Sequence, residues 1–222
     1  MKTTRKALLM VLCAVLLVAG SVLGTMAYLT DTEDVTNTFT FGKVDIKLDE
    51  ATLDKETGKA TSDPRTETGN TDVKMIPGRV IDKDPTVTVL GGSEACFVRM
   101  KVTVENLANL KAAFPAANYP TYYSGEMFLL DKLCNIDSTN WTFSSISDNV
   151  YEFRYKSEVA KSDANTPLPA LFTTLTVPGA AVTNENIDEL ASVQIKVTAE
   201  AVQSESFGSD ANTAWAAITT TP

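Results

Sequence analysis

The chain contains no histidine among its 222 residues. This absence excludes the HExxH zinc sites, the Ser-His-Asp triads and the Cys-His dyads, because each of them needs an imidazole. The sequence also lacks the GxGxxG and GxxxxGK(S/T) loops that bind phosphate groups. We therefore predict no catalytic residue, no cofactor-binding residue and no metal ligand, and we expect the protein not to be an enzyme.

Cysteine is scarce, with three residues in the whole chain. Cys13 lies within an apolar run near the N-terminus, which leaves Cys96 and Cys134. These two can form one disulfide in an oxidising compartment. Two buried free thiols fit equally well, because Cys96 lies within an apolar strand pattern. In either case two cysteines do not make a disulfide scaffold.

Acidic residues are plentiful but form no recognisable ligand pattern. They cluster at residues 31–34 (DTED) and 82–84 (DKD). Carboxylate oxygens suit calcium, but neither cluster has the spacing of a calcium loop. Blocks of charge are usually solvated, so we interpret both clusters as surface charge.

The N-terminal segment, residues 1–27, has the features of a secretory signal peptide. Three positive charges precede residues 7–24, which carry no charge, and small residues follow at positions 25 and 27. This order predicts cleavage between Ala27 and Tyr28. A membrane anchor is the alternative, since 18 helical residues span roughly 27 Å against a hydrocarbon core of about 30 Å. The Thr-Met-Ala ending and the lack of a basic flank favour cleavage.

Cleavage removes three of the 19 basic residues and none of the 28 acidic ones, which changes the net charge from −9 to −12. A surface this acidic repels nucleic acid and anionic lipid. We therefore expect no nucleic-acid partner and no membrane association after cleavage. The processed chain, residues 28–222, is long enough for one sizeable core.

Alternating apolar and polar residues dominate the processed chain and predict β-strands. In residues 96–104 (CFVRMKVTV) the valines and Met100 would face in, and Arg99, Lys101 and Thr103 would face out. Residues 192–203 (SVQIKVTAEAVQ) form the longest expected strand, with Ile195 and Val197 on its inner face. Further strands are expected at residues 85–90, 141–143, 150–155 and 171–177.

The non-strand segments complete the predicted fold. Leu107, Leu110 and Phe114 have helical spacing, and residues 210–218 predict a helical turn capped by Asp210 or a packed tail. Residues 49–72 are polar and predict an exposed loop. Seven or eight short strands with little helix predict an all-β fold. We expect an antiparallel, jelly-roll-like β-sandwich with one or two short helices, forming a single domain over residues 28–222.

The strand pattern in residues 38–48 (TFTFGKVDIKL) contains an irregularity. The phenylalanines at positions 39 and 41 share one face, whereas the apolar residues at 44, 46 and 48 have the opposite parity. A slip of one residue beside a glycine predicts a β-bulge or strand break at Gly42-Lys43.

Taken together, these segments resemble the TasA/camelysin family of secreted biofilm-matrix fibre proteins from Gram-positive, spore-forming bacteria. The N-terminal match is the most specific and comprises GTMA at 24–27, DTE at 31–33, NTFT at 37–40 and Gly42. Weaker matches are IPG at 76–78 with KDPTV at 83–87, and AEAVQ at 199–203 followed by Trp215. The chain departs from the family pattern in its polar insertion at 49–72 and its two cysteines.

The resemblance implies a jelly-roll sandwich that is exported to the extracellular matrix or cell surface and cleaved by a dedicated signal peptidase of the SipW type. It also implies that the protein assembles with itself into a homopolymeric fibre by donor-strand exchange. A minor matrix or anchor protein would be a further partner.

Physical reasoning supports such an assembly. An edge strand exposes unpaired N–H and C=O groups, and an extended segment from another chain can satisfy them. Because donor and acceptor are different surfaces, the contact is head-to-tail and can form filaments. We predict residues 28–41 as the donor. Its expected pocket-filling side chains are Tyr28, Leu29, Val35, Phe39 and Phe41.

Two other functions stay open at this point. One is a monomeric cell-surface adhesin or binding module that shares only the fold. The other is a camelysin-like surface endopeptidase. Without histidine, a zinc site would need Cys, Asp or Glu ligands alone, which is unusual for catalytic zinc. The resemblance favours the structural protein over both.

Overall fold

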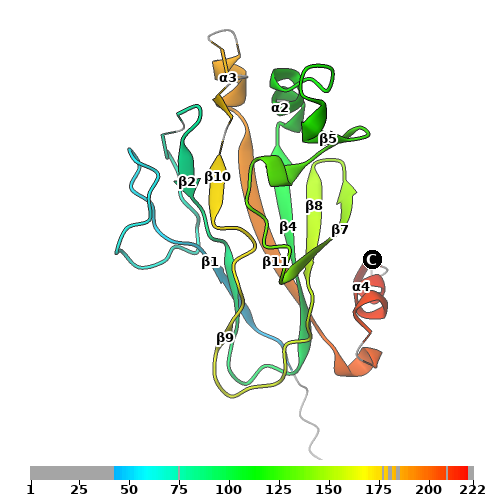
Figure 1. Ribbon diagram of the computed structural model, residues 1–222. Helices are drawn as coiled ribbons and strands as arrows, with labels where there is room; N and C mark the ends of the chain where they lie inside the picture. Colours follow the sequence, from blue (N-terminus) through cyan, green and yellow to red (C-terminus); the bar gives the residue numbers. More distant parts are fainter. Residues whose placement is uncertain are drawn as a thin grey trace, which may run out of the picture. The chain divides into compact units, whose positions relative to one another are not determined.

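The computed structural model describes residues 43–74, 76–176, 178–179, 182–183, 186–208 and 210–219. Every strand pair in this part of the chain is antiparallel (Figure 1). The fold is therefore all-β and antiparallel, as predicted. The expected signal peptide, its cleavage point at Ala27-Tyr28, the donor segment 28–41 and Gly42 lie outside the described residues.

The strands of the described residues form one four-stranded sheet and three smaller ones. The four-stranded sheet has the order β11 (Gln194–Gln203), β4 (Cys96–Glu105), β8 (Val150–Tyr155) and β7 (Trp141–Ser147). The three-stranded sheet has the order β1 (Ile46–Asp49), β3 (Thr86–Val89) and β9 (Thr166–Pro167). The pairs are β10 (Thr174–Thr176) with β2 (Val80–Asp82), and β5 (Tyr123–Ser124) with β6 (Met127–Phe128).

One hydrophobic core joins these sheets. Strand β4 contributes the most deeply buried face, because its alternating apolar residues all point inward. Val98, Met100, Val102 and Val104 are fully buried, as the alternation predicts. Val87 of β3 and Leu175 of β10 belong to the same core. The larger sheet thus packs against the smaller ones in a sandwich-like arrangement.

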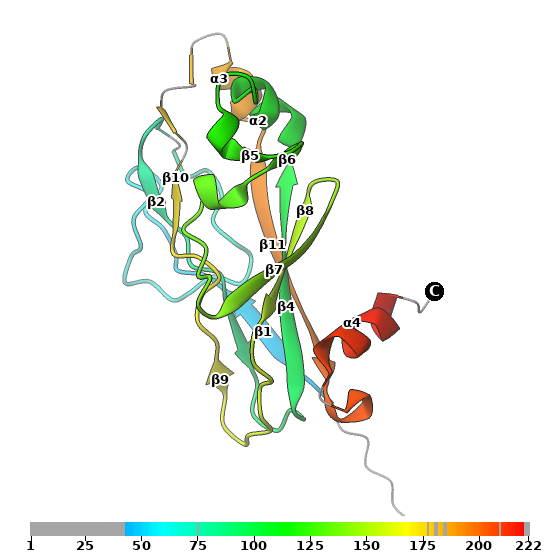
Figure 2. The ribbon, with the colours of Figure 1, turned by 45° about the vertical axis from the view of Figure 1, so that its right-hand side comes forward.

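Short helices lie at one end of the four-stranded sheet and against its outer face near the other end. Helix α2 (Leu107–Ala113) follows β4 as predicted, and the single turn α3 (Ile187–Leu190), which the sequence pattern did not predict, precedes β11 at the same end. Helix α4 (Ala211–Thr219) lies beside the other end, as Figure 2 shows. The described part of the chain also contains the 3-10 turns η1 (Pro120–Tyr122), η2 (Leu130–Lys132) and η4 (Glu205–Phe207). Among the described residues no helix is long and apolar enough to cross a membrane.

Helix α4 covers Arg99, which the alternation predicted to face out. Arg99 does lie on the outer face of β4, but only 3% of it is exposed. Its guanidinium carbon lies 4.3 Å from the ring centroid of Trp215 on α4. Its Nη1 donates to Glu152 at 2.9 Å and its Nε donates to Glu200 at 2.7 Å. The predicted outward orientation is confirmed, but strand alternation cannot reveal that a distant helix covers this outer face.

Asp210 and Trp215 fulfil both of the alternatives considered for the C-terminal segment. Asp210 precedes α4 and accepts hydrogen bonds from the Asn212 amide at 3.0 Å and the Thr213 hydroxyl at 2.6 Å. The Thr213 hydrogen bond is the main cause of a lowered Asp210 pKa. Trp215 is 2% exposed and packs with Phe97 and Val202.

Strand β7 is longer than the predicted strand at 141–143. It continues to Ser147 and joins β8 through the two residues Asp148 and Asn149. Asp148 has a φ of 54°, a conformation that aspartate and asparagine tolerate in tight hairpins. Pairing with β8 extends the strand, with an irregularity between Phe143 and Ser145.

Candidate interaction groove

Strand β11 lies at an open edge of the four-stranded sheet. Within the described part of the chain its only sheet neighbour is β4. The Ser204 amide donates to the Ala95 carbonyl at 2.9 Å. Because Ser204 lies opposite Ala95 in the register of β11 and β4, this bond shows which residues of β11 form hydrogen bonds with β4. In an antiparallel pair, alternate residues direct both backbone groups to the same neighbour. The even-numbered residues of β11 therefore bond to β4, and the odd-numbered residues direct their N–H and C=O groups to the open edge.

The inner face of β11 is only partly covered. Its inward side chains are half-buried, whereas those of the adjacent β4 are fully buried. The half-buried residues are Ile195, Val197, Ala199 and Ala201. These are the same odd-numbered residues whose backbone groups face the open edge. An additional strand beside β11 could therefore cover their side chains and satisfy their backbone groups at once.

Strand β1 lies beside β11 and has a second, shorter open edge. Its sheet neighbour among the described strands is β3. The Leu90 amide donates to the Asp45 carbonyl at 2.9 Å, so Ile46 and Leu48 direct their backbone groups away from β3. Both side chains are half-buried. We call this open strip the edge groove. Its side chains are Ile46, Leu48, Ile195, Val197, Ala199 and Ala201.

The segment 49–72, predicted as an exposed polar loop, covers the far end of the β1 edge. Glu50 and Thr66 exchange two backbone hydrogen bonds of 3.0 and 2.8 Å. Most of the segment is exposed, but Asp49, Glu50 and Leu53 are 9%, 6% and 7% exposed. Because the loop occupies the edge at Glu50, β11 offers the longer free edge.

Ion pairs hold this loop in place and explain how carboxylates can be buried there. Arg65 donates from Nε to Asp49 at 2.6 Å and from Nη1 to Asp84 at 2.7 Å. Burial raises the pKa of Asp49, but the hydrogen bonds from Arg65 and Lys47 outweigh it and lower the pKa overall. The ionised Asp49 therefore stabilises the folded chain at a pH above the pKa that this group has in the unfolded chain. This contribution is lost as the pH falls through the lower pKa that Asp49 has in the folded chain.

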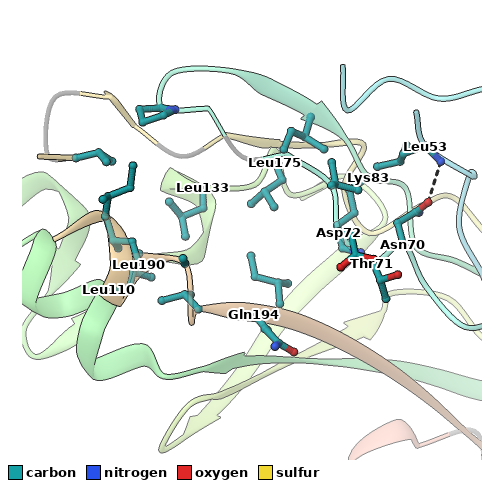
Figure 3. A pocket seen from close by; sticks show the side chains of 18 residues that line it. Leu53, Asn70, Thr71, Asp72, Lys83, Leu110, Leu133, Leu175, Leu190 and Gln194 are labelled. Atoms are coloured by element: carbon teal, nitrogen blue, oxygen red, sulfur yellow. Dashed lines mark hydrogen bonds between the residues drawn. The ribbon is translucent and has the colours of Figure 1, made fainter. Parts of the chain in front are cut away.

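An apolar cavity of about 630 Å³ opens at the end of the edge groove nearest α2 and α3. Figure 3 shows four leucines toward one side of it, and a group of polar side chains together with Leu53 toward the other. The labelled leucines beside the helices and β10 are Leu110, Leu133, Leu175 and Leu190. The labelled polar side chains near Leu53 are Asn70, Thr71, Asp72 and Lys83, and Gln194 is labelled at the start of β11. The cavity is also lined by residues at the start of β11 and just before it, namely Val193, Gln194 and Ile195.

Two of the polar residues that line the cavity, Lys83 and Asn70, bond to protein partners. Lys83 pairs with Glu50 at 2.5 Å, and the Asn70 side chain donates to Glu50 at 2.9 Å. Asn70 also accepts a hydrogen bond from the Leu53 amide at 2.8 Å, which appears as the dashed line in Figure 3. Since these groups bond to one another, the cavity is suited to an apolar occupant.

The two cysteines considered for a disulfide are free and buried, Cys96 in β4 and Cys134 beside β10. Burial raises the pKa of the Cys96 thiol to about 11 and that of Cys134 to about 12. Both thiols therefore stay protonated near neutral pH and are poor nucleophiles. In the described ranges no group of three or more His, Cys, Asp or Glu residues is placed to hold a metal.

The structure brings the inner faces of β1 and β11 together, but the predicted donor residues Tyr28, Leu29, Val35, Phe39 and Phe41 lie outside its described part. Sequence reasoning placed Ile195 and Val197 on an inner face without showing that their strand is an edge. No family model, curated protein or solved structure matches this chain.

Proposed function

We propose that this chain is a secreted structural protein of the extracellular matrix that assembles into fibres. A dedicated signal peptidase removes residues 1–27. Residues 28–41 of each processed chain then complete the sheet of the next copy, within a jelly-roll-like sandwich.

The observation that carries the proposal is the open edge of β11. Alternate residues of this ten-residue strand have half-buried apolar side chains. The backbone groups of the same residues have no sheet partner among the described strands. Exposed apolar edges of this kind promote pairing with another chain. The sequence of residues 28–41 is partly apolar, which suits a segment that pairs with such an edge.

The donor and the acceptor are different parts of the chain. A contact between different surfaces is heterologous, so it continues from copy to copy instead of closing as a dimer. This property favours a filament over a discrete oligomer. Before cleavage the apolar N-terminal run would keep the donor at the membrane, so cleavage at Ala27-Tyr28 would control the start of assembly. An uncleavable variant that still formed fibres would contradict this control.

The apolar cavity favours one alternative, a monomeric adhesin or binding module that accepts a small apolar ligand. A cavity of about 630 Å³ lies in the size range of small-molecule sites. This alternative differs from the proposal in a simple way, because it predicts a monomer at every protein concentration.

Negative-stain microscopy of two chains tests the proposal. The full chain is expressed in a secreting bacterial host, and the processed product is compared with a chain that begins at Gly42. The shorter chain retains the whole described core and is expected to fold. We expect filaments from the processed product alone, because only this product carries the donor. Filaments from both chains, or from neither at any salt or pH, would refute the proposal.

A further inference from the structure

We infer the polarity and register of the strand that the edge groove receives. Residues 28–41 of a second copy run antiparallel to β11 and place Phe41 opposite Ile195. Phe41 then enters the apolar cavity, and Phe39 lies at its mouth opposite Val197. The inference rests on the proposed function and specifies how its interface is built.

The polarity follows from where the chain enters the fold. The Glu94 amide donates to the Lys43 carbonyl at 3.0 Å, so the donor segment leaves each copy beside the β3–β4 turn. The cavity lies at the opposite end of the sheet, where β11 begins at Gln194. In a head-to-tail stack, the exit end of one copy meets the cavity end of the next. The donor residue nearest Lys43, Phe41, therefore lies at the cavity.

This placement makes the incoming strand antiparallel to β11. Strand β11 runs from the cavity end at Gln194 to Gln203, which pairs with Cys96 near the exit end. The incoming strand runs in the opposite sense, since its earlier residues lie toward Gln203 and Phe41 lies at the cavity. Antiparallel pairing also matches every other pairing described in this fold.

The parity of the donor matches that of the groove. Leu29, Val35, Phe39 and Phe41 all have odd numbers, so they share one face of an extended strand. Residues directly opposite in an antiparallel pair place their side chains on the same face. With Phe41 opposite Ile195, the other apolar side chains also point inward. A slip of one residue would turn all four toward solvent. Tyr28 has the other parity and would lie on the outer face.

The length and the cavity select one register among those of correct parity. The donor, residues 28–41, is longer than the ten-residue β11, and extended strands rise by nearly the same length per residue. The donor can therefore cover the whole edge. A shift of two residues in one direction would carry Phe41 past Gln194, the first residue of β11. A shift in the other direction would withdraw Phe41 from the cavity, which would then lack an aromatic occupant.

Inter-chain disulfides test this register. A processed chain carrying Val35→Cys is mixed with an equal amount of a chain carrying Ala201→Cys, and in a matched mixture with a chain carrying Ile195→Cys. Val35→Cys retains both phenylalanines, and the native thiols are buried. After oxidation of the filaments, we expect the disulfide between positions 35 and 201 at least tenfold more often than that between 35 and 195. The bonded peptides are identified by mass spectrometry.

Each outcome decides a separate question. Filaments that preferentially join positions 35 and 195 would show the opposite polarity and overturn the inference, while fibre formation itself would stand. Filaments with neither disulfide would also overturn it and would indicate that another surface accepts the donor. If mixtures with an excess of unsubstituted chain form no filaments, both the inference and the proposed function fail, and a small apolar molecule becomes the expected cavity occupant.

Discussion

The substitution Val197→Lys is expected to abolish fibre assembly by the processed chain while the monomer remains folded. Val197 is half-buried in the monomer and would be fully covered by the incoming strand. Burying an unpaired ammonium costs several kcal/mol. Each loss of about 1.4 kcal/mol lowers an association constant tenfold. We therefore expect the critical concentration for assembly, measured by sedimentation, to rise at least about a hundredfold.

The neighbouring substitution Thr198→Lys provides a matched control. Thr198 is exposed, and its side chain points to the outer face of the same strand. The added residue and its position along β11 are nearly the same, but the charge lies in water. We expect assembly close to that of the unsubstituted chain. Equal inhibition by both substitutions would indicate a general effect of charge and would contradict the role of the groove. Thermal unfolding of both monomers checks that they are folded.

Replacing Arg99 with alanine is expected to lower the free energy of unfolding by about 3 kcal/mol, because removing one partner of a buried ion pair typically costs about 3–5 kcal/mol. The cost arises since the other charge stays buried without compensation. Here it lies at the low end, because Glu152 keeps a hydrogen bond from Arg154 at 2.7 Å. The contact with Trp215 is also lost. Urea denaturation monitored by tryptophan fluorescence measures the change.

Lys101→Ala is the control for this second prediction. Lys101 bonds to Glu200 at 2.6 Å, but its side chain is 29% exposed and that of Glu200 is 39% exposed. Ion pairs of this exposure contribute about 0–1 kcal/mol. A similar loss of stability for both substitutions would mean that the burial of Arg99 under α4 has little energetic importance.

The strands could be predicted largely from the sequence, because each buried face follows a two-residue period. Val98 and Val102 are fully buried as that period requires. The same period also gave the inner face of β11. It could not show that β11 lies at an edge, since edge and central strands can have the same pattern when only one face is buried. That distinction depends on which distant strand pairs with it.

The buried charges were also inaccessible to sequence reasoning. Arg99 occupies an outward-facing position of a strand, and Asp49 and Glu50 begin a polar segment, so none of the three looks buried in the sequence. Each is buried because a partner far along the chain neutralises it, such as Glu200 for Arg99 and Lys83 for Glu50. The loop 49–72 therefore looked featureless in the sequence, although ion pairs and the Glu50–Thr66 bridge fix it against β1.

The most direct test of the central claim is the binding of a synthetic peptide of residues 28–41 to the chain that begins at Gly42. That chain has the edge groove but no donor, so it cannot polymerise through this contact. Calorimetric titration is expected to show saturable binding of one peptide per chain, an increase in unfolding temperature, and no binding to the same chain with Val197→Lys. Absence of binding, or equal binding to the substituted chain, would contradict the account.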